Sequence, residues 1–268
     1  MSHDVTALAD LAETIALEAA ELAARRRREG VRVADRKSSI VDVVTAADQE
    51  VEALVRARIA HHRPDDGFLG EESGAERGTS GLTWVVDPID GTVNYLYGNP
   101  MYGISIAVVA GEPDPASWTP VAGVVVAPSM GDVFRAEHGR GATRNGIPLR
   151  VGGPASLAES LVATGFAYTA ERRVAQVEVL GGLIADVRDI RRMGAASLDL
   201  CAVASGVVDA YYERGINPWD MAAGAMVAAE AGAVVTSWES GDARVHVVAA
   251  PTIAAEFTAR IRSLDAGR

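Results

Sequence analysis

The chain has 268 residues, of which 49% are hydrophobic and 23% charged, so it can form a substantial core and does not have the composition of a disordered protein. Its 25 basic and 36 acidic residues give a formal net charge of −11, which argues against general nucleic-acid binding and docking on anionic lipid, since both need a basic surface. A single cysteine, Cys201, excludes an intrachain disulfide, and no apolar run is long enough for a membrane span, so we expect a cytoplasmic protein.

The N-terminal part predicts two helices. Apolar residues recur at helical spacing from Val5 to Leu22, and Gly30 is placed to end this first helix. Four arginines, at positions 25–28, occupy its last turn, and we interpret them as a solvated helix end, with an anion- or partner-binding patch as the alternative. A second helix is expected near Thr45, because the segment from Thr45 to Asp48 reads TAAD and resembles a capping box with Asp in place of Glu or Gln.

The rest of the sequence indicates two parts, divided at the glycine-rich segment 152–154. Before this boundary, apolar runs separated by Gly, Pro and Asn predict strands at Trp84–Val86, Ile104–Val109, Val121–Val126 and Asp132–Arg135. After it, strands are expected at Leu161–Thr164, Ile190–Met193, Val207–Tyr212, Val234–Val235 and Val245–Val248, alternating with helices at Glu171–Ala185, Ala195–Ala204, Pro218–Ala231 and Thr252–Leu264. This alternation is typical of an α/β fold.

The most informative segment is the hexapeptide from Asp87 to Thr92, which reads DPIDGT and follows the apolar run Trp84–Val86. Ligands of α/β proteins bind where strands end and open into a turn or a helix. Two carboxylates three residues apart offer oxygen-only ligands, which favour a hard cation such as Mg²⁺ over zinc. The amides of Gly91 and Thr92 can begin a helix and face a phosphate, and the alternative is a plain Asp-Pro turn followed by a helix cap.

Two further acidic segments lie far from this hexapeptide in the sequence. Glu71 and Glu72 follow Gly70, and two adjacent carboxylates repel each other unless a cation or solvent compensates them, so the alternative is a solvated acidic loop. Asp220 follows Trp219 at the start of an expected helix. There it either interacts favourably with the helix dipole or supplies a third carboxylate from the second half of the chain, while Trp219 is interpreted as a packing residue.

Taken together, these segments resemble the inositol monophosphatase family of the Mg²⁺-dependent, lithium-sensitive phosphatase superfamily, which also includes fructose-1,6-bisphosphatases. The resemblance rests on the order GEE, DPIDGT and WD, and it extends from Lys37 to the last expected strand. The other matching segments are Val44–Asp48 (VTAAD), Gly139–Ala142 (GRGA), Asn145–Gly146 and Asp209–Glu213 (DAYYE).

The resemblance implies ligands for two or three Mg²⁺ ions. Glu71, Asp87 and the backbone carbonyl of Ile89 would hold a first ion. Asp87, Asp90 and Asp220 would hold a second, so that Asp87 bridges the two. Glu71 would also help to place a third, more weakly bound ion.

The resemblance also implies catalytic and substrate-binding residues. Asp48 and Thr92 would orient the attacking water, and Glu71 would take part in catalysis through the ions that it places. The residues implied to contact the substrate are Lys37, Asp90, Gly91, Thr92, Ala195, Ala196 and Glu213.

The fold implied by the resemblance is a layered α-β-α-β-α sandwich that forms one catalytic unit, with an N-terminal α+β lobe at 1–150 and a C-terminal α/β lobe at 151–268. The implied function is hydrolysis of inositol monophosphate by in-line attack of a metal-activated water, inhibited by lithium, in a homodimer. Phosphate monoester hydrolysis is among the slowest uncatalysed reactions, and clustered cations offset the charge of the phosphate dianion.

Two kinds of alternative follow from the same residues. Relatives in this superfamily hydrolyse histidinol phosphate, fructose 1,6-bisphosphate, NADP or 3′-phosphoadenosine 5′-phosphate. Glu213 suits a neutral polyol and would repel a second phosphate unless a basic residue intervened, for which Arg214 is the nearest candidate in the sequence. Some bacterial members also bind the transcription machinery, so the alternative of another class is a regulatory protein, although the complete set of carboxylates favours an enzyme.

Overall fold

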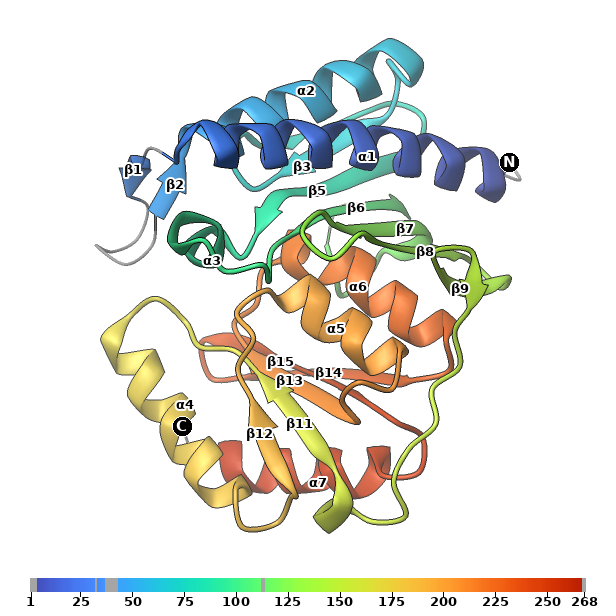
Figure 1. Ribbon diagram of the computed structural model, residues 1–268. Helices are drawn as coiled ribbons and strands as arrows, with labels where there is room; N and C mark the ends of the chain where they lie inside the picture. Colours follow the sequence, from blue (N-terminus) through green and yellow to red (C-terminus); the bar gives the residue numbers. More distant parts are fainter. Residues whose placement is uncertain (1–3, 32, 37–42, 112–113, 267–268) are drawn as a thin grey trace.

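The computed structural model describes residues 4–31, 33–36, 43–111 and 114–266, and its elements form five layers (Figure 1). The helices are α1 (Val5–Glu29), α2 (Ala46–His62), α3 (Thr92–Tyr97), α4 (Ala170–Leu183), α5 (Ala196–Ala204), α6 (Pro218–Glu230), α7 (Ala254–Asp265) and the 3₁₀ turn η1 (Leu157–Glu159). α1 and α2 cover one face of a first sheet, α5 and α6 lie between this sheet and a second one, and α4 and α7 cover the outer face of the second sheet. The expected α-β-α-β-α sandwich is therefore confirmed.

Both sheets are mixed, and each is built from one half of the chain. The first has the order β10-β9-β8-β7-β6-β5-β3-β4, and the second has the order β12-β11-β13-β15-β14. The strands of the first sheet are β3 (Gly67–Gly70), β4 (Gly74–Glu76), β5 (Leu82–Asp90), β6 (Gly103–Ala110), β7 (Thr119–Ala127), β8 (Asp132–Glu137), β9 (Gly141–Arg144) and β10 (Ile147–Pro148). The others are β11 (Leu161–Thr164), β12 (Asp189–Arg191), β13 (Ala210–Arg214), β14 (Val234–Ser240) and β15 (Ala243–Ala249), with β1 (Val33–Arg36) and β2 (Val43–Thr45) forming a separate pair.

Two strands differ from the sequence expectation in ways that affect the site. β5 does not end at Val86 but continues to Asp90, so the hexapeptide lies within the end of the strand, where the pairing register shifts between Asp87 and Asp90. The strand expected to begin at Val207 begins at Ala210 instead, because the Val207 amide donates to the Ala202 carbonyl at the end of α5.

α1 and α2 begin and end at recognisable caps. The Asp4 carboxylate accepts a hydrogen bond from the Ala7 amide, and α1 ends at Gly30 with a φ of 106° that favours glycine. α2 begins at Thr45 with the predicted reciprocal capping box, because the Asp48 carboxylate accepts from the Thr45 amide and the Thr45 side chain accepts from the Asp48 amide.

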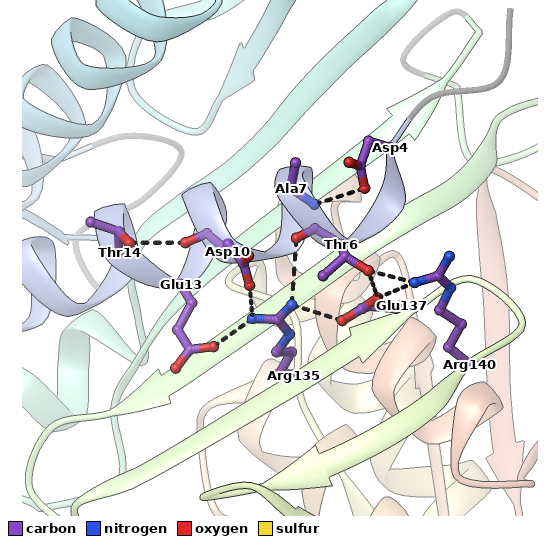
Figure 2. A network of polar contacts seen from close by, with 9 residues as sticks. All are labelled: Asp4, Thr6, Ala7, Asp10, Glu13, Thr14, Arg135, Glu137 and Arg140. Carbon is purple, nitrogen blue, oxygen red and sulfur yellow. Dashed lines mark hydrogen bonds and ion pairs between the residues drawn. The ribbon is translucent and has the colours of Figure 1, made fainter.

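A polar network fastens α1 to the first sheet (Figure 2). Arg135 on β8 pairs with Asp10 and Glu13 of α1 at 2.7 and 3.0 Å, and with Glu137 of its own strand at 2.7 Å. The Thr6 hydroxyl donates to Glu137 at 2.6 Å. Burial raises the pKa of the Glu137 carboxyl, but the Thr6 and Arg135 hydrogen bonds outweigh it, so the net pKa is lowered.

The central core joins the two halves of the chain. Buried side chains of β6 and β7 pack there with those of α5 and α6, including Val125 from the first half and Met226 and Leu200 from the second. α6 therefore contacts the first sheet although it follows the second-sheet strand β13 in the sequence. Within the described part of the chain, no helix combines the length and apolarity that a membrane span requires.

Candidate active site

The end of β5 positions the first two carboxylates of the site. Asp87 and Asp90 are both buried, and the Ile89 amide donates to Asp87 Oδ1 at 3.0 Å, which fixes the bulged backbone. Gly91 then caps α3 in the left-handed region, with a φ of 86°. A Cβ there would lie 2.9 Å from the Met101 carbonyl oxygen, so this turn requires glycine on both counts.

The third carboxylate arrives from the second half of the chain. Asp220 is the third residue of α6, and its Oδ2 accepts a hydrogen bond from the Asn217 amide at 2.9 Å in a capping box. Asp87, Asp90 and Asp220 each present a ligand oxygen within 4.8 Å of the others. Burial raises the pKa of Asp87 and Asp220, and repulsion by Glu71 and Asp90 raises both further. Such a set of mutually repelling oxygen ligands fits a hard divalent cation.

Asp90 also connects the two halves of the chain through hydrogen bonds. Its Oδ2 accepts from the Ser197 amide at 2.7 Å and from the Ser197 hydroxyl at 2.5 Å, and its Oδ1 accepts from the Ala196 amide at 3.2 Å. These donors lie at the start of α5, so Asp90 caps a helix of the other half. Burial raises the pKa of Asp90, while the Ser197 hydrogen bonds oppose this shift.

A buried glutamate that the sequence analysis missed holds the loop with Glu71. Glu52 on α2 is only 3% exposed, and its carboxylate accepts from the amides of Glu72 and Ser73, each at 2.8 Å. A Cβ on Gly70 would lie 2.5 Å from Glu52 Oε2, which explains the glycine before the two glutamates. Spacing on α2 gave no signal for Glu52, because its partners are 20 and 21 residues away.

Asp48 and Thr92 are brought together from α2 and α3. The Thr92 hydroxyl lies 3.1 Å from Asp48 Oδ1 and 3.0 Å from the Ile89 carbonyl oxygen, so its single proton can serve one of them at a time. Burial raises the pKa of Asp48 to about 7, although hydrogen bonds from Thr45 oppose the shift.

The three aspartates, Glu71 and Thr92 line a cavity of about 450 Å³ whose walls come from both halves of the chain. Glu213 at the end of β13 accepts a hydrogen bond from the Tyr211 hydroxyl at 2.6 Å, and burial raises the pKa of Glu213 to about 7. The side chains of Arg172 and Arg192 also line the cavity. Arg214, which the sequence suggested as the basic neighbour of Glu213, does not line it, because its guanidinium turns to Asp242 and Asp265 on the other side of the strand.

The cavity gathers most of the candidate residues. Asp48 lies behind Thr92 and does not itself line the cavity, and Lys37 lies outside the described residues. Trp219 lines the cavity while packing against the central core, as its interpretation as a packing residue required. The candidate residues that line the cavity are Glu71, Asp87, Ile89, Asp90, Gly91, Thr92, Ala195, Ala196, Glu213 and Asp220.

Comparison with known proteins assigns the chain to a family. The model of the inositol monophosphatase family matches residues 4–265. The chain belongs to this family. It is 42% identical to the inositol-1-monophosphatase SuhB of Mycobacterium tuberculosis, over 96% of this chain and 94% of the relative, and it is therefore a phosphatase of this family.

A further relative has a different name, and one relative has a solved structure. A protein of Pasteurella multocida named Nus factor SuhB is 39% identical, over 82% of this chain and 83% of the relative. The solved structure of Mycobacterium tuberculosis SuhB superimposes with a TM-score of 0.84 at 41% identity, over 98% of this chain and 99% of that chain. The fold expected from the sequence is thus also the fold of a close relative.

Proposed function

We propose that the protein is a Mg²⁺-dependent phosphomonoesterase that hydrolyses inositol monophosphate to inositol and phosphate. The observation that carries this proposal is the convergence of Asp87, Asp90 and Asp220, from two halves of the chain, within 4.8 Å at one cavity. The names of the relatives that share more than 40% identity with this chain, inositol-1-monophosphatases, support the same substrate.

We propose that this donor set holds two Mg²⁺ ions and a weaker third. Asp87, Asp90 and Asp220 would share one ion, and Glu71, Asp87 and the Ile89 carbonyl another, since only carboxylate and carbonyl oxygens are offered. When bound, the ions lower the pKa of a water and neutralise the phosphate and the leaving oxygen. We expect Li⁺ to inhibit, because a small monovalent ion fits an oxygen-lined position but neutralises less phosphate charge.

Thr92 and Asp48 have the geometry to orient the attacking water. With the Ile89 carbonyl engaged as a ligand, the Thr92 hydroxyl proton goes to Asp48 Oδ1, 3.1 Å away, and the Thr92 oxygen is left as an acceptor for water. Asp48 is itself held by the Thr45 amide at 2.8 Å. This chain of hydrogen bonds would orient the attacking water before the reaction and so lower the entropic cost of aligning it.

Glu213 and the start of α5 form the side of the cavity that would hold the inositol ring. The Glu213 carboxylate is fixed by the Tyr211 hydroxyl and has lone pairs left for substrate hydroxyls. The small side chains of Ala195 and Ala196 leave room beside it. Phosphate would be held by the Gly91 and Thr92 amides at the end of β5.

The proposal is tested with a panel of phosphate esters at fixed Mg²⁺ and with EDTA. We expect kcat/KM to be highest for inositol monophosphate, compared with histidinol phosphate, fructose 1,6-bisphosphate, NADP and 3′-phosphoadenosine 5′-phosphate, with no turnover in EDTA. A higher kcat/KM for another ester of the panel would mean that this ester, and not inositol monophosphate, is the preferred substrate. Turnover in EDTA would mean that the reaction does not depend on Mg²⁺.

We also propose how the protein is organised. Residues 1–150 and 151–268 would be two lobes of one catalytic unit, a division supported by the separate sheets built from each half. We expect a homodimer in the cytoplasm that does not bind nucleic acid directly, consistent with the net charge of −11.

A second function, binding of the transcription machinery, is favoured by the relatives named Nus factor SuhB at 38–39% identity. It would accompany catalysis rather than replace it. A pull-down of RNA polymerase and Nus factors with the Asp90→Asn variant would detect such binding without turnover, and absence of any such partner would exclude it.

A further inference from the structure

Asp199 is a buried carboxylate to which the family resemblance gave no role. It lies in the first turn of α5, is 1% exposed, and lines the same cavity as the metal cluster. Its Oδ1 has no hydrogen-bond partner among the described residues. A buried acceptor without a donor destabilises a protein, so it calls for an explanation, and binding of a ligand that carries a donor is one.

The charged groups around Asp199 make the burial of its carboxylate still less favourable. Asp90 and Glu213 both repel the negative charge of Asp199. Among the described residues that act on this charge, Arg192 is the one cation that attracts it. Burial and these two carboxylates raise the pKa of Asp199. Arg192 also attracts Asp90 and Glu213, so one guanidinium serves three carboxylates. A ligand that brings hydrogen-bond donors would complete this arrangement.

We propose that Asp199 is a substrate-binding residue that accepts a hydrogen bond from a ring hydroxyl of the polyol monophosphate, beside Glu213. This inference rests on the proposed function and adds a second hydroxyl-binding carboxylate to it. The carboxylates disfavour a second phosphate near them. Arg192 already supplies a positive charge to these carboxylates, so a cationic ligand is not required either. The ligand expected at this side of the cavity is therefore a neutral donor, that is, a hydroxyl.

A purely structural role and a ligand-binding role of Asp199 predict opposite changes in the unfolding temperature when Asp199 is replaced with Asn. An acidic residue in the first turn of a helix is stabilised by the helix dipole, so replacing Asp199 with Asn would then lower the unfolding temperature. A ligand-binding role predicts that Asp199→Asn raises the unfolding temperature of the metal-free protein at pH 8, because an uncompensated buried charge is removed. Stability therefore distinguishes the two roles independently of activity.

The experiment combines unfolding temperatures with kcat/KM for inositol 1-phosphate and for 4-nitrophenyl phosphate, which has no ring hydroxyls. We expect Asp199→Asn to unfold at a higher temperature and to lower kcat/KM for inositol 1-phosphate about 10-fold, the scale of one hydrogen bond to a charged group, with 4-nitrophenyl phosphate almost unchanged. Glu213→Gln should show the same split between substrates. Asp132→Asn is the matched control, because Asp132 is a buried aspartate outside the cavity that pairs with Arg144 at 2.6 Å. It should lower stability without separating the substrates.

A series of monodeoxy inositol phosphates then locates the contact. For one of them, Asp199→Asn should cause no further loss, because the hydroxyl that Asp199 binds is already missing. The inference is overturned if Asp199→Asn slows both substrates equally, lowers the unfolding temperature, or keeps its effect with every deoxy substrate. If the wild-type enzyme hydrolyses 4-nitrophenyl phosphate but not inositol 1-phosphate, the proposed substrate fails, and this inference fails with it.

Discussion

Thr92 and Asp48 touch through a single hydrogen bond of 3.1 Å, and the proposed mechanism assigns catalysis rather than binding to this contact. Because alignment of water matters most in the transition state, Thr92→Ala and Asp48→Asn should each lower kcat about 100-fold or more with little change in KM. Thr14→Ala, on the exposed side of α1, is the control and should match the wild type. A phosphorylated side chain trapped during turnover would contradict attack by water.

The crowded carboxylates also predict how pH affects stability. The pKa values of Asp87, Asp90 and Asp220 are raised in the folded state above an ordinary value of 3.8, chiefly by burial. The folded protein therefore retains protons that the unfolded chain has released, so the metal-free protein loses stability as pH rises above about 4 and through the raised pKa values.

Mg²⁺ should remove this penalty, because it takes the place of the protons between the carboxylates. We expect Mg²⁺ to raise the unfolding temperature by more at pH 8 than at pH 5, measured by thermal scans with and without the ion at each pH. An equal or larger effect at pH 5 would mean that these carboxylates are not the ones that bind Mg²⁺.

Among the elements, α2 supports the site through Glu52, which holds the loop after Gly70. Glu52→Gln replaces one acceptor oxygen with an NH₂ group that faces a backbone N–H, so one loop amide loses its partner. We expect the unfolding free energy to fall by about 1–3 kcal/mol and Mg²⁺ affinity to fall about 10- to 100-fold, as for other groups that position metal ligands. Glu50→Gln, an exposed change on the same helix, is the control, and equal Mg²⁺ titrations for the two variants would contradict this role.

Features with local determinants could be predicted from the sequence, and features that depend on distant contacts could not. The TAAD capping box and the strand Leu161–Thr164 were predictable because their determinants are local. The interpretation of the arginines at 25–28 as a solvated end was wrong for Arg27. Its guanidinium lies 4.7 Å from the Tyr102 ring and donates to the Asn99 carbonyl at 2.5 Å. These partners are 75 and 72 residues away in the sequence, so they leave no local pattern.

At the scale of the whole molecule, the site exists because α5 and α6 lie between the two sheets. Asp90 from the first half caps α5 of the second half, and Asp220 on α6 lies close to Asp87 of the first half. The motif resemblance could predict which carboxylates come together, but not that Asp90 accepts three hydrogen bonds from α5 or that Asp199 lines the same cavity. Such contacts depend on the tertiary packing of segments more than 100 residues apart.

We expect carboxylates from both halves of the chain to hold Mg²⁺ jointly for phosphate ester hydrolysis. The most direct test of this joint binding is the Mg²⁺ dependence of inositol 1-phosphate turnover by Asp220→Asn, with the exposed Asp10→Asn, remote from the cavity, as the control. Asn keeps the shape of Asp220 but removes its charge, so activity at limiting Mg²⁺ should fall about 100-fold or more, since groups that only support metal ligands already cost about 10- to 100-fold. The circular dichroism spectrum should stay that of the wild type. Wild-type turnover by Asp220→Asn at limiting Mg²⁺ would mean that Asp220 does not hold a catalytic Mg²⁺ ion.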